Sequence, residues 1–538
     1  MRQADRSYLT LLLRGGLPAV CFIACGILAS GAVGQSPPNP NYQRQPLFAS
    51  YADFKSQLLS IVGVADPAQR DSQLNTFWTT LQNAGQVPYA QGNQYAYLYR
   101  GNITTTSVAF AGDFNSWNPS AGSAQATNLA GANLWIREGT LPASGRTDYK
   151  VVVNGNWILD PANPLQMWGG LGANNELRMP GYVFPQETVR NPATPRGTMT
   201  ANTLINSSNM SYGVNYRVYT PANYSANNLR DLPVVYVTDG HEYAADYLGS
   251  MPIVLDNLIA AGQLRPTIAV FIDPRQPGSP SNNRRLSEYN MNANFANFVA
   301  SELVPAIDVS YRTQANADSR TILGTSMGGL NAAYFGAVKS NVFHNIASQS
   351  PAYNQNQAIY PLYENNNLQF LNIFQTNGTL GGDNSGADRM RNTWNAHGYE
   401  YSSIVVNEGH SWGQWRGQLD DILTTVIGPP LVGDYDQDGA VDTADYVTWR
   451  ERQGAASMAN RDPANTGAVG QADYDAWRAH FGQTLASLAG GSSVPFVPAA
   501  FALPLPEPAV SGMLLTGVLV SCCSQLAARN HTPRATQP

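Results

Sequence analysis

Hydrophobic and polar positions in the second half of the chain indicate alternating strands and helices. Short apolar runs at 232–238, 267–272, 321–324, 371–375 and 403–406 are bounded by polar or glycine-rich residues, which predicts buried strands. Stretches with helical apolar spacing, such as 295–311 and 331–338, lie between them. Strands that alternate with helices predict a mostly parallel sheet, so residues 202–430 are expected to form an α/β domain.

The first half of the chain has a different pattern. Residues 48–83 have helical apolar spacing, and from residue 95 onward short strand-like runs are separated by Gly, Asn and Pro. This pattern predicts a helical lead-in followed by a β-domain.

The β-domain contains motifs that resemble a known glycan-binding module. "VAFAGDFNSWNP", "GRTDYKVVVNGNWILDPANP" and "LGANNELRMPGY" lie within residues 98–182 and resemble the β-sandwich of carbohydrate-binding module family 48. The resemblance implies a glycan platform of Trp117, Lys150, Trp157 and Asn174 or Asn175. An indole can stack on a sugar face and an amine can reach its hydroxyls. The alternative is a packing domain in which Trp117 belongs to the core.

A candidate nucleophile lies in "SRTILGTSMGGLNAAYFG", residues 319–336. Here a β-branched run leads into Gly-Thr-Ser-Met-Gly and then into an alanine-rich helical stretch. Glycines on both sides of Ser326 permit a tight strand-to-helix turn that projects the hydroxyl. The start of the following helix favours a developing oxyanion at the Met327 amide.

A serine nucleophile needs a base, and the chain has six histidines. His241, in "TDGHEY", follows an early predicted strand, and His410, in "NEGHSWGQWR", follows a late one. The order Ser, acid, His that is typical of α/β-hydrolases selects His410, and His241 is better placed beside the oxyanion hole. The acid must lie between Ser326 and His410; Asp383 follows a predicted strand, and Asp388 is the reserve because it lies inside the next helix.

With these residues placed, residues 202–430 resemble the esterase family that unites feruloyl and acetylxylan esterases of carbohydrate esterase family 1 with enterobactin esterases. "VVYVTDG", "RRLSEYN", "FVASELVPAI", "GTSMGG" and "GHSWGQWR" carry the resemblance. It implies Ser326 as nucleophile, His410 as base, Asp383 as acid, and the Met327 amide with an amide near Gly240 as oxyanion hole. The insertion "TLGGD" departs from the family pattern at the acid.

A repeat follows the α/β domain, because "ADYVTWR" at 444–450 returns as "ADYDAWR" at 472–478. The stretch "DYDQDGAVDTAD" before the first copy has carboxylates at positions 1, 3, 5, 9 and 12 of a calcium loop. The predicted Ca²⁺ ligands are Asp434, Asp436, Asp438, Asp442 and Asp445. The paired arrangement resembles a type I dockerin, which implies docking to a cohesin-like scaffold.

The second copy of the repeat lacks most of these ligands. Asp462 and Asp473 occupy positions 1 and 12, whereas Ala464, Thr466 and Gly470 occupy positions 3, 5 and 9. Calcium takes six to eight oxygens, so we expect one tight site and a second that is weak or empty.

Both ends of the chain have export features. Arginines precede the apolar run "LPAVCFIACGILASGAVG", and Ala32-Val33-Gly34 offers a cleavage point, as in a signal peptide. A second apolar run at 509–527 follows "PLPEPAV" and resembles the Pro-Glu-Pro C-terminal sorting signals of exported bacterial proteins. The tail is therefore expected to contact the membrane before processing, and the protein to be secreted or displayed at the cell surface.

Composition excludes one class of partner. Charged residues make up 13% of the 538 residues, the net charge is −6, and the chain has only three lysines. Without a basic run there is no electrostatic footprint for nucleic acid.

The sequence thus predicts a multidomain chain with a β-sandwich, an α/β-hydrolase and a small calcium-loop helical repeat. The boundaries are 1–34 (signal peptide), 45–190 (helical lead-in and β-sandwich), 200–430 (esterase), 431–483 (repeat), 484–504 (linker) and 505–538 (tail). The expected activity is hydrolysis of acyl esters on polysaccharide through an acyl-enzyme, without a catalytic cofactor. The alternatives are a siderophore esterase and a noncatalytic glycan-binding surface protein.

Overall fold

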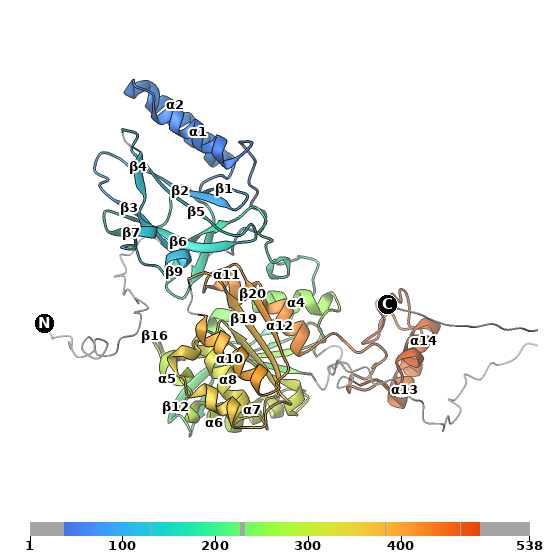
Figure 1. The fold of residues 1–538 in the computed structure, drawn as a ribbon. Helices are drawn as coiled ribbons and strands as arrows, with labels where there is room; N and C mark the ends of the chain where they lie inside the picture. Colours follow the sequence, from blue (N-terminus) through green and yellow to red (C-terminus); the bar gives the residue numbers. More distant parts are fainter. Residues whose placement is uncertain (1–36, 130, 226–231, 382–383, 463, 485–538) are drawn as a thin grey trace, which may run out of the picture. The chain divides into compact units, whose positions relative to one another are not determined.

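The computed structural model describes residues 37–129, 131–225, 232–381, 384–462 and 464–484 (Figure 1). The chain separates into Met1–Ala489 and Gly490–Pro538. The predicted signal peptide and sorting tail lie outside the described residues. Among the described residues, no helix has the length and apolar character needed to span a bilayer.

The lead-in forms two helices, α1 (Tyr51–Val62) and α2 (Pro67–Asn83). Ser50 caps α1 by accepting a hydrogen bond from the Asp53 amide, and Asp66 caps α2 in the same way with the Gln69 amide. Such caps satisfy amides that have no partner inside the helix. The prediction of helical structure before the β-domain is confirmed, with a break at residues 63–66.

Two antiparallel sheets follow, and they share a buried cluster that includes Tyr97, Phe110, Tyr149 and Leu177. Side chains of consecutive strand residues point to opposite faces, so each sheet turns one apolar face toward this cluster. The first sheet has the order β1 (Tyr89–Gln91), β2 (Gln94–Arg100), β5 (Leu134–Thr140), β4 (Thr127–Leu129). The second has the order β3 (Val108–Gly112), β6 (Arg146–Val153), β9 (Gly172–Arg178), β8 (Gln166–Gly169), with β7 (Asn156–Ile158) beside β6. Short 3₁₀ turns are η1 (Asp113–Asn115), η2 (Gly122–Ala124) and η3 (Gln186–Thr188).

The α/β domain contains a nine-stranded mixed sheet. Its six strands from β14 to β20 run parallel, whereas β12 pairs antiparallel with β14, β10 and β11. The order is β10 (Thr198–Met199), β12 (Tyr212–Thr220), β14 (Ile268–Asp273), β13 (Val234–Val237), β17 (Arg320–Thr325), β18 (Asn345–Gln349), β19 (Asn372–Gly378), β20 (Tyr401–Val406), with β11 (Thr203–Ser207) beside β12. A separate pair is β15 (Arg275–Gln276) and β16 (Ser279–Asn283). All five predicted strands are present, and β10, β11, β12 and β18 are strands of this sheet that the apolar pattern did not identify.

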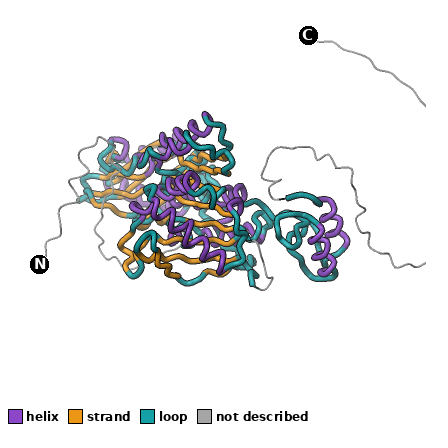
Figure 2. The backbone as a smooth tube through the Cα atoms, turned by 90° about the horizontal axis from the view of Figure 1, so that it is seen from below, coloured by secondary structure: helices purple, strands orange, loops and turns teal. Residues whose placement is uncertain are grey.

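Helices cover both faces of this sheet (Figures 1 and 2). Alternate strand residues divide between two core clusters: Tyr236 and Ile322 face one, Val237 and Leu323 the other. The first cluster is covered by α6 (Ala293–Phe298), a π-helical turn η4 (Val299–Leu303), α7 (Val304–Ser310), α8 (Met327–Val338), α9 (Ile359–Glu364) and α10 (Ser385–Ala396). The second is covered by α4 (Met251–Ala260), α11 (Trp412–Arg416) and α12 (Leu419–Val426). The remaining elements are α3 (Gly240–Tyr243), α5 (Arg285–Tyr289), η5 (Ala317–Ser319) and η6 (Tyr353–Gln355).

The repeat forms two helices, α13 (Thr443–Arg452) and α14 (Gln471–His480). The indole of Trp449 on α13 donates to the Gly470 carbonyl, and the indole of Trp477 on α14 donates to the Asp442 carbonyl. Because Asp442 and Gly470 are the N-caps of the two helices, each tryptophan holds the start of the other helix. The repeated "W" of the sequence therefore has a reciprocal structural role.

Candidate active site

Ser326 lies at the turn between the central strand β17 and helix α8. Its backbone has φ 57° and ψ −114°, a region that costs an L-residue roughly 1–3 kcal/mol. The Ser326 amide donates to the Gln349 carbonyl of the neighbouring strand at 2.8 Å, and the amide of Ala352 donates to the Ser326 carbonyl at 2.9 Å. A strained serine held on both sides by backbone bonds matches the nucleophile elbow predicted from sequence.

The glycines around Ser326 are required by close packing against Thr238. A Cβ atom on Gly328 would lie 2.5 Å from Thr238 Oγ1, and one on Gly324 would overlap with both Thr238 Oγ1 and the Gly328 carbonyl. No side chain fits at such distances. The Gly-x-Ser-x-Gly spacing therefore lets this turn pack directly on the end of β13.

Gly240, the second expected residue of the oxyanion hole, follows β13 by three residues. It begins helix α3, after Asp239 in the left-handed region with φ 52°. A Cβ on Gly240 would overlap with the backbone of Phe271 and Ile272 on β14. The elbow and this loop both follow the carboxyl ends of paired strands, because Val237 on β13 pairs with Leu323 on β17.

Arg285 links the turn that carries Ser326 to the loop that carries Gly240. Sequence reasoning missed this role. Its Nε donates to both carboxylate oxygens of Asp239 at 2.9 Å, and its Nη2 donates to the Thr325 carbonyl at 2.9 Å. The Asp239 amide also donates to the Tyr289 hydroxyl at 2.9 Å. Arg285 thus braces the residues just before Gly240 and Ser326. The motif "RRLSEYN" was the available signal, but nothing local assigned its arginine a partner.

His410 lies in the turn between β20 and α11; we call residues 407–413 the His410 loop. The His410 ring meets Trp415 edge to face, with centroids 5.0 Å apart. Helix α11 then contacts the strand beside the elbow, because the Gln349 side chain donates to the Trp415 carbonyl at 2.7 Å. Ser326 and His410 are both described, and no hydrogen bond joins their side chains. Such bonds are often longer before substrate binds.

Desolvation by neighbouring protein atoms, followed by the positive charge of Arg285, lowers the pKa of His410 to about 4. His410 also keeps an exposed surface. A lowered pKa keeps the imidazole neutral at neutral pH, the form that a general base needs.

The expected acid, Asp383, lies outside the described residues. The chain just before it runs beside the His410 loop, because the Thr379 amide donates to the Val406 carbonyl at 2.9 Å and the Leu380 amide to the Glu408 carbonyl at 3.0 Å. The reserve acid, Asp388, forms an ion pair with Arg391 on the surface of α10, and its side chain is 59% exposed. The acid therefore stays a prediction.

His241 follows Gly240 directly and lies among charged groups. Its Nδ1 is 3.5 Å from Asp273 Oδ1 and its Nε2 is 3.9 Å from Glu242 Oε1. Burial lowers the pKa of His241 to about 4, against the opposing effect of Asp273. A role for His241 beside the oxyanion hole stays a prediction.

The residues of the expected glycan platform do not form one free surface. Register places Lys150, Val152 and Trp157 on the same face of the second sheet, and Asn174 lies on the adjoining strand β9. Trp117 has a different setting, because its indole donates to the buried Asp113 at 3.0 Å. Asn175 is fully buried and donates to the Asn163 carbonyl at 2.9 Å, so the alternative platform residue is a structural one.

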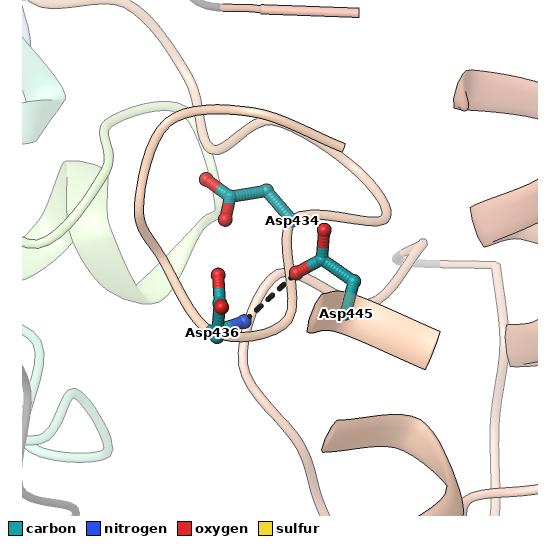
Figure 3. Close-up of side chains that lie close together, drawn as sticks. All are labelled: Asp434, Asp436 and Asp445. Carbon is teal, nitrogen blue, oxygen red and sulfur yellow. Dashed lines mark hydrogen bonds between the residues drawn. The ribbon is translucent and has the colours of Figure 1, made fainter. Parts of the chain in front are cut away.

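The first loop of the repeat brings three of the five predicted metal ligands together. Carboxylate oxygens of Asp434, Asp436 and Asp445 lie within 4.8 Å of one another, and Figure 3 shows the three carboxylates around one point. Asp434 is buried, with an exposed fraction of 3%, and its Oδ1 has no hydrogen-bond partner. A buried carboxylate oxygen without a partner fits a cation. The other two predicted ligands, Asp438 and Asp442, are not part of this group, and their carboxylates accept hydrogen bonds from the Ala440 and Ala444 amides.

In the second loop of the repeat, an arginine side chain supplies the positive charge. The guanidinium of Arg461 donates through Nε and Nη2 to the two carboxylate oxygens of Asp473, at 2.6 and 2.9 Å, and through Nη1 to the Gly467 carbonyl at 2.9 Å. Asp473 occupies position 12, where the first loop uses Asp445. Burial alone would raise the pKa of Asp473, but the hydrogen bonds from Arg461, the Gly470 amide and Asn465, with the charge of Arg461, together outweigh burial and lower the pKa. The expectation of a weak or empty second site thus gains a physical reason.

Comparisons with known proteins agree on an esterase-like fold. Residues 207–426 match the family described as "Putative esterase". The iron(III) enterobactin esterase of Escherichia coli (strain K12) is 30% identical over 206 residues, which are 36% of this chain and 46% of that protein. The chain spans about half to two thirds of the length of the curated relatives it matches.

The solved enterobactin esterase of Shigella flexneri superimposes with a TM-score of 0.51 and 22% identity. The superposition covers 62% of this chain and 92% of that chain, so the likeness in fold extends beyond residues 207–426. A ferulic acid esterase structure matches with a TM-score of 0.36 and 18% identity, over 43% of this chain and 98% of its own.

Proposed function

We propose that this protein is a serine carboxylesterase that removes ester-linked feruloyl or acetyl groups from polysaccharide. The observation that supports it most is the strained turn at Ser326, beside the Gly240 loop and on the same sheet edge as His410. A non-glycine residue at positive φ persists only where the surrounding structure holds it, and such positions cluster at functional sites.

The proposed reaction is a double displacement. Ser326 Oγ attacks the acyl carbonyl while His410 accepts its proton, and the Met327 and Gly240 amides stabilise the oxyanion. His410 then gives the proton to the sugar oxygen, which leaves as an alcohol. Water, deprotonated by His410, hydrolyses the acyl-enzyme and releases the acid and Ser326. Asp383 is the group proposed to orient the imidazole.

A siderophore triester is the second candidate substrate. One observation favours it: the fold similarity to an enterobactin esterase covers 62% of this chain and therefore includes more than the α/β domain. The polysaccharide proposal is supported instead by the resemblance of the β-domain to a glycan-binding module. Both proposed substrates would be hydrolysed by the same ester chemistry. They would differ in the substrate pocket that they require.

One panel of esters tests the proposal. Turnover of aryl acetate, methyl ferulate, acetylated xylan and enterobactin would be compared, and a fluorophosphonate probe would be mapped by peptide mass spectrometry. We expect the adduct on Ser326 and the highest kcat/KM on a polysaccharide-type ester. Preferred turnover of enterobactin would select the second candidate. Absence of both turnover and labelling would remove the esterase proposal.

Glycan binding by the β-domain is a separate proposal, and Trp157 is its best test. We expect Trp157→Ala to weaken pull-down on insoluble or branched glucans and xylans about tenfold, because roughly 1–2 kcal/mol of stacking is lost. Turnover of a small soluble ester should stay the same. The matched control is Trp78→Ala, on helix α2 outside the second sheet. Unchanged binding by a folded Trp157→Ala variant would leave the domain as a packing element.

Calcium binding by the repeat is proposed at one site. Calorimetry on the full chain should give one tight Ca²⁺ per chain, lost in Asp434→Asn and retained in Asp462→Asn, the matched position of the second loop. Two sites of similar affinity would contradict the proposal. Arg461 explains the expected stoichiometry, because Ca²⁺ at the second loop would have to displace a guanidinium that already pairs with Asp473.

The calcium affinity should also depend on pH. Burial and then the charge of Asp445 raise the pKa of Asp434 to about 8, and burial raises that of Asp445 to about 7. Protons therefore compete with Ca²⁺, and affinity should fall about tenfold per pH unit for each proton displaced below these values. Because both pKa values are raised by folding, the metal-free repeat should lose stability as pH rises from about 4 to 8. Calorimetry in buffers of different ionisation heat measures the released protons.

Export and assembly complete the proposal. Residues 1–34 would direct secretion, the tail at 505–538 would contact the membrane before processing, and the repeat would dock to a cohesin-like partner. Mass spectrometry of the protein recovered from culture medium would locate both mature termini. Termini at the first and last residues of the chain would contradict the processing.

A further inference from the structure

We propose that Arg146, a residue of the β-domain, is a positioning residue for the catalytic histidine. This inference rests on the proposed esterase function, since it assigns His410 a part in turnover. It makes the β-domain a structural component of the active site, in addition to any glycan that the domain binds.

Arg146 contacts the His410 loop on both sides of the histidine. Before it, the Arg146 amide donates to the Asn407 carbonyl at 3.0 Å, and Nη1 lies 3.6 Å from Glu408 Oε2. After it, Nη1 donates to Ser411 Oγ at 3.3 Å. A Cβ on Gly413 would overlap with the guanidinium, so the loop lies against Arg146 at its far end as well.

Arg146 is itself fixed by its own domain. Its Nη2 donates to Asp148 at 2.6 Å and its Nε donates to Glu176 at 2.7 Å, and the side chain is only 1% exposed. A planar guanidinium that holds two carboxylates has a single orientation. The groups that it presents to residues 408 and 411 are therefore fixed in direction. The His410 loop takes its position from strands β6 and β9 as well as from its own β20.

A second contact from the β-domain supports the same role. Asp113, at the start of η1, lies so close to Gly409 and Gly381 that a Cβ on either glycine would overlap with it. Gly409 precedes His410, and Gly381 lies two residues before the expected acid. The Asp113 carboxylate accepts from the Asp148 amide at 2.8 Å and from Trp117 at 3.0 Å. One end of the second sheet thus packs against both loops that the triad needs.

The test compares two buried arginines of one cluster. Arg178 also pairs with Glu176, and the hydrogen bonds and ion pairs described for it reach no residue of the His410 loop. Arg146→Lys keeps the positive charge but loses the several planar N–H donors of the guanidinium. Arg178→Lys makes the same change at a side chain that does not bond to the His410 loop. Turnover of an aryl acetate would be measured from pH 4 to 9 for both variants, alongside circular dichroism and thermal melting.

We expect Arg146→Lys to lower kcat about 10- to 100-fold with little change in KM. The acid limb of its kcat/KM profile should move to higher pH, because a loosened loop removes neighbouring protein atoms that desolvate His410 and lets its pKa rise. Arg178→Lys should keep kcat within about threefold of the wild type and keep the limb in place. Equal effects of the two changes, or an unchanged limb in folded Arg146→Lys, would overturn the inference.

Two further controls keep the outcome decisive. If Arg146→Lys does not fold, Ser411→Ala removes one acceptor of Arg146 without leaving a buried charge, and the same direction of change is expected at about 3- to 10-fold. An unchanged kcat and an unchanged acid limb there would overturn the inference. A wild type with no turnover would instead remove the proposed function, so the two failures are distinguishable.

Discussion

Ser326→Ala is expected to reduce kcat/KM on an activated acetate ester about 10⁴-fold or more, because the hydroxyl that forms the acyl-enzyme is gone. The fold should remain, since alanine retains the Cβ atom and the backbone bonds of residue 326 to Gln349 and Ala352 do not involve the side chain. Steady-state kinetics with a thermal melt would measure both effects.

The matched control for Ser326 is another serine on a helical turn of the same domain. Ser301 lies in η4, is exposed, and its hydroxyl donates to the Asn297 carbonyl. Ser301→Ala should leave turnover unchanged and alter stability by less than about 0.5 kcal/mol. Substantial activity in a folded Ser326→Ala variant would remove Ser326 from the mechanism.

Asp383→Asn is expected to cost about 10²- to 10⁴-fold in kcat, because an amide can neither hold the needed imidazole tautomer nor stabilise the imidazolium. Asp388→Asn should cost less than about threefold, since its carboxylate pairs with Arg391 on an exposed helix surface, where such pairs contribute about 0–1 kcal/mol. Kinetics on the two variants under identical conditions decide between them.

The ranking of these two aspartates is the informative outcome. A larger loss in Asp388→Asn would move the acid to α10 and require the ion pair with Arg391 to break during turnover. Equal and small losses would exclude both residues. In each case the melting temperature shows whether a loss reflects chemistry or unfolding, because surface substitutions of this kind change stability little.

Buried strands with apolar runs were predictable, whereas the buried strand β18, whose run is largely polar, was not. The run at 232–238 corresponds to β13 and the run at 403–406 to β20. Strand β18 reads "NIASQ" and is buried throughout, yet its polar groups are satisfied only by distant partners. Ser348 donates to the Gly329 carbonyl, and Gln349 bonds Tyr243 and Trp415. Hydrophobic periodicity cannot identify a strand whose burial depends on such bonds.

The predicted helix at 295–311 shows how one local feature modified a correct expectation. The segment is helical throughout, but it changes from α6 to a π-helical turn at Val299–Leu303 before α7. Pro305 lies in the first turn of α7, and proline offers no amide to the residues before it. Apolar spacing predicted the helix, and a proline in the sequence was the only sign of its irregularity.

The sequence by itself predicted the strand-to-helix turn that carries Ser326 and the carboxylate loop of the repeat, because each is a local structure. Gly-x-Ser-x-Gly between a strand and a helix specifies a turn through adjacent residues, and the spacing of carboxylates in one loop specifies which of them can meet. Tertiary structure alone decided that Arg285 joins Asp239 to Thr325, that Arg461 pairs with Asp473, and that Arg146 holds the His410 loop. A buried guanidinium needs partners at fixed angles, and the packing of separate elements supplies them, as for Arg146 and Ser411, which are 265 positions apart in the sequence.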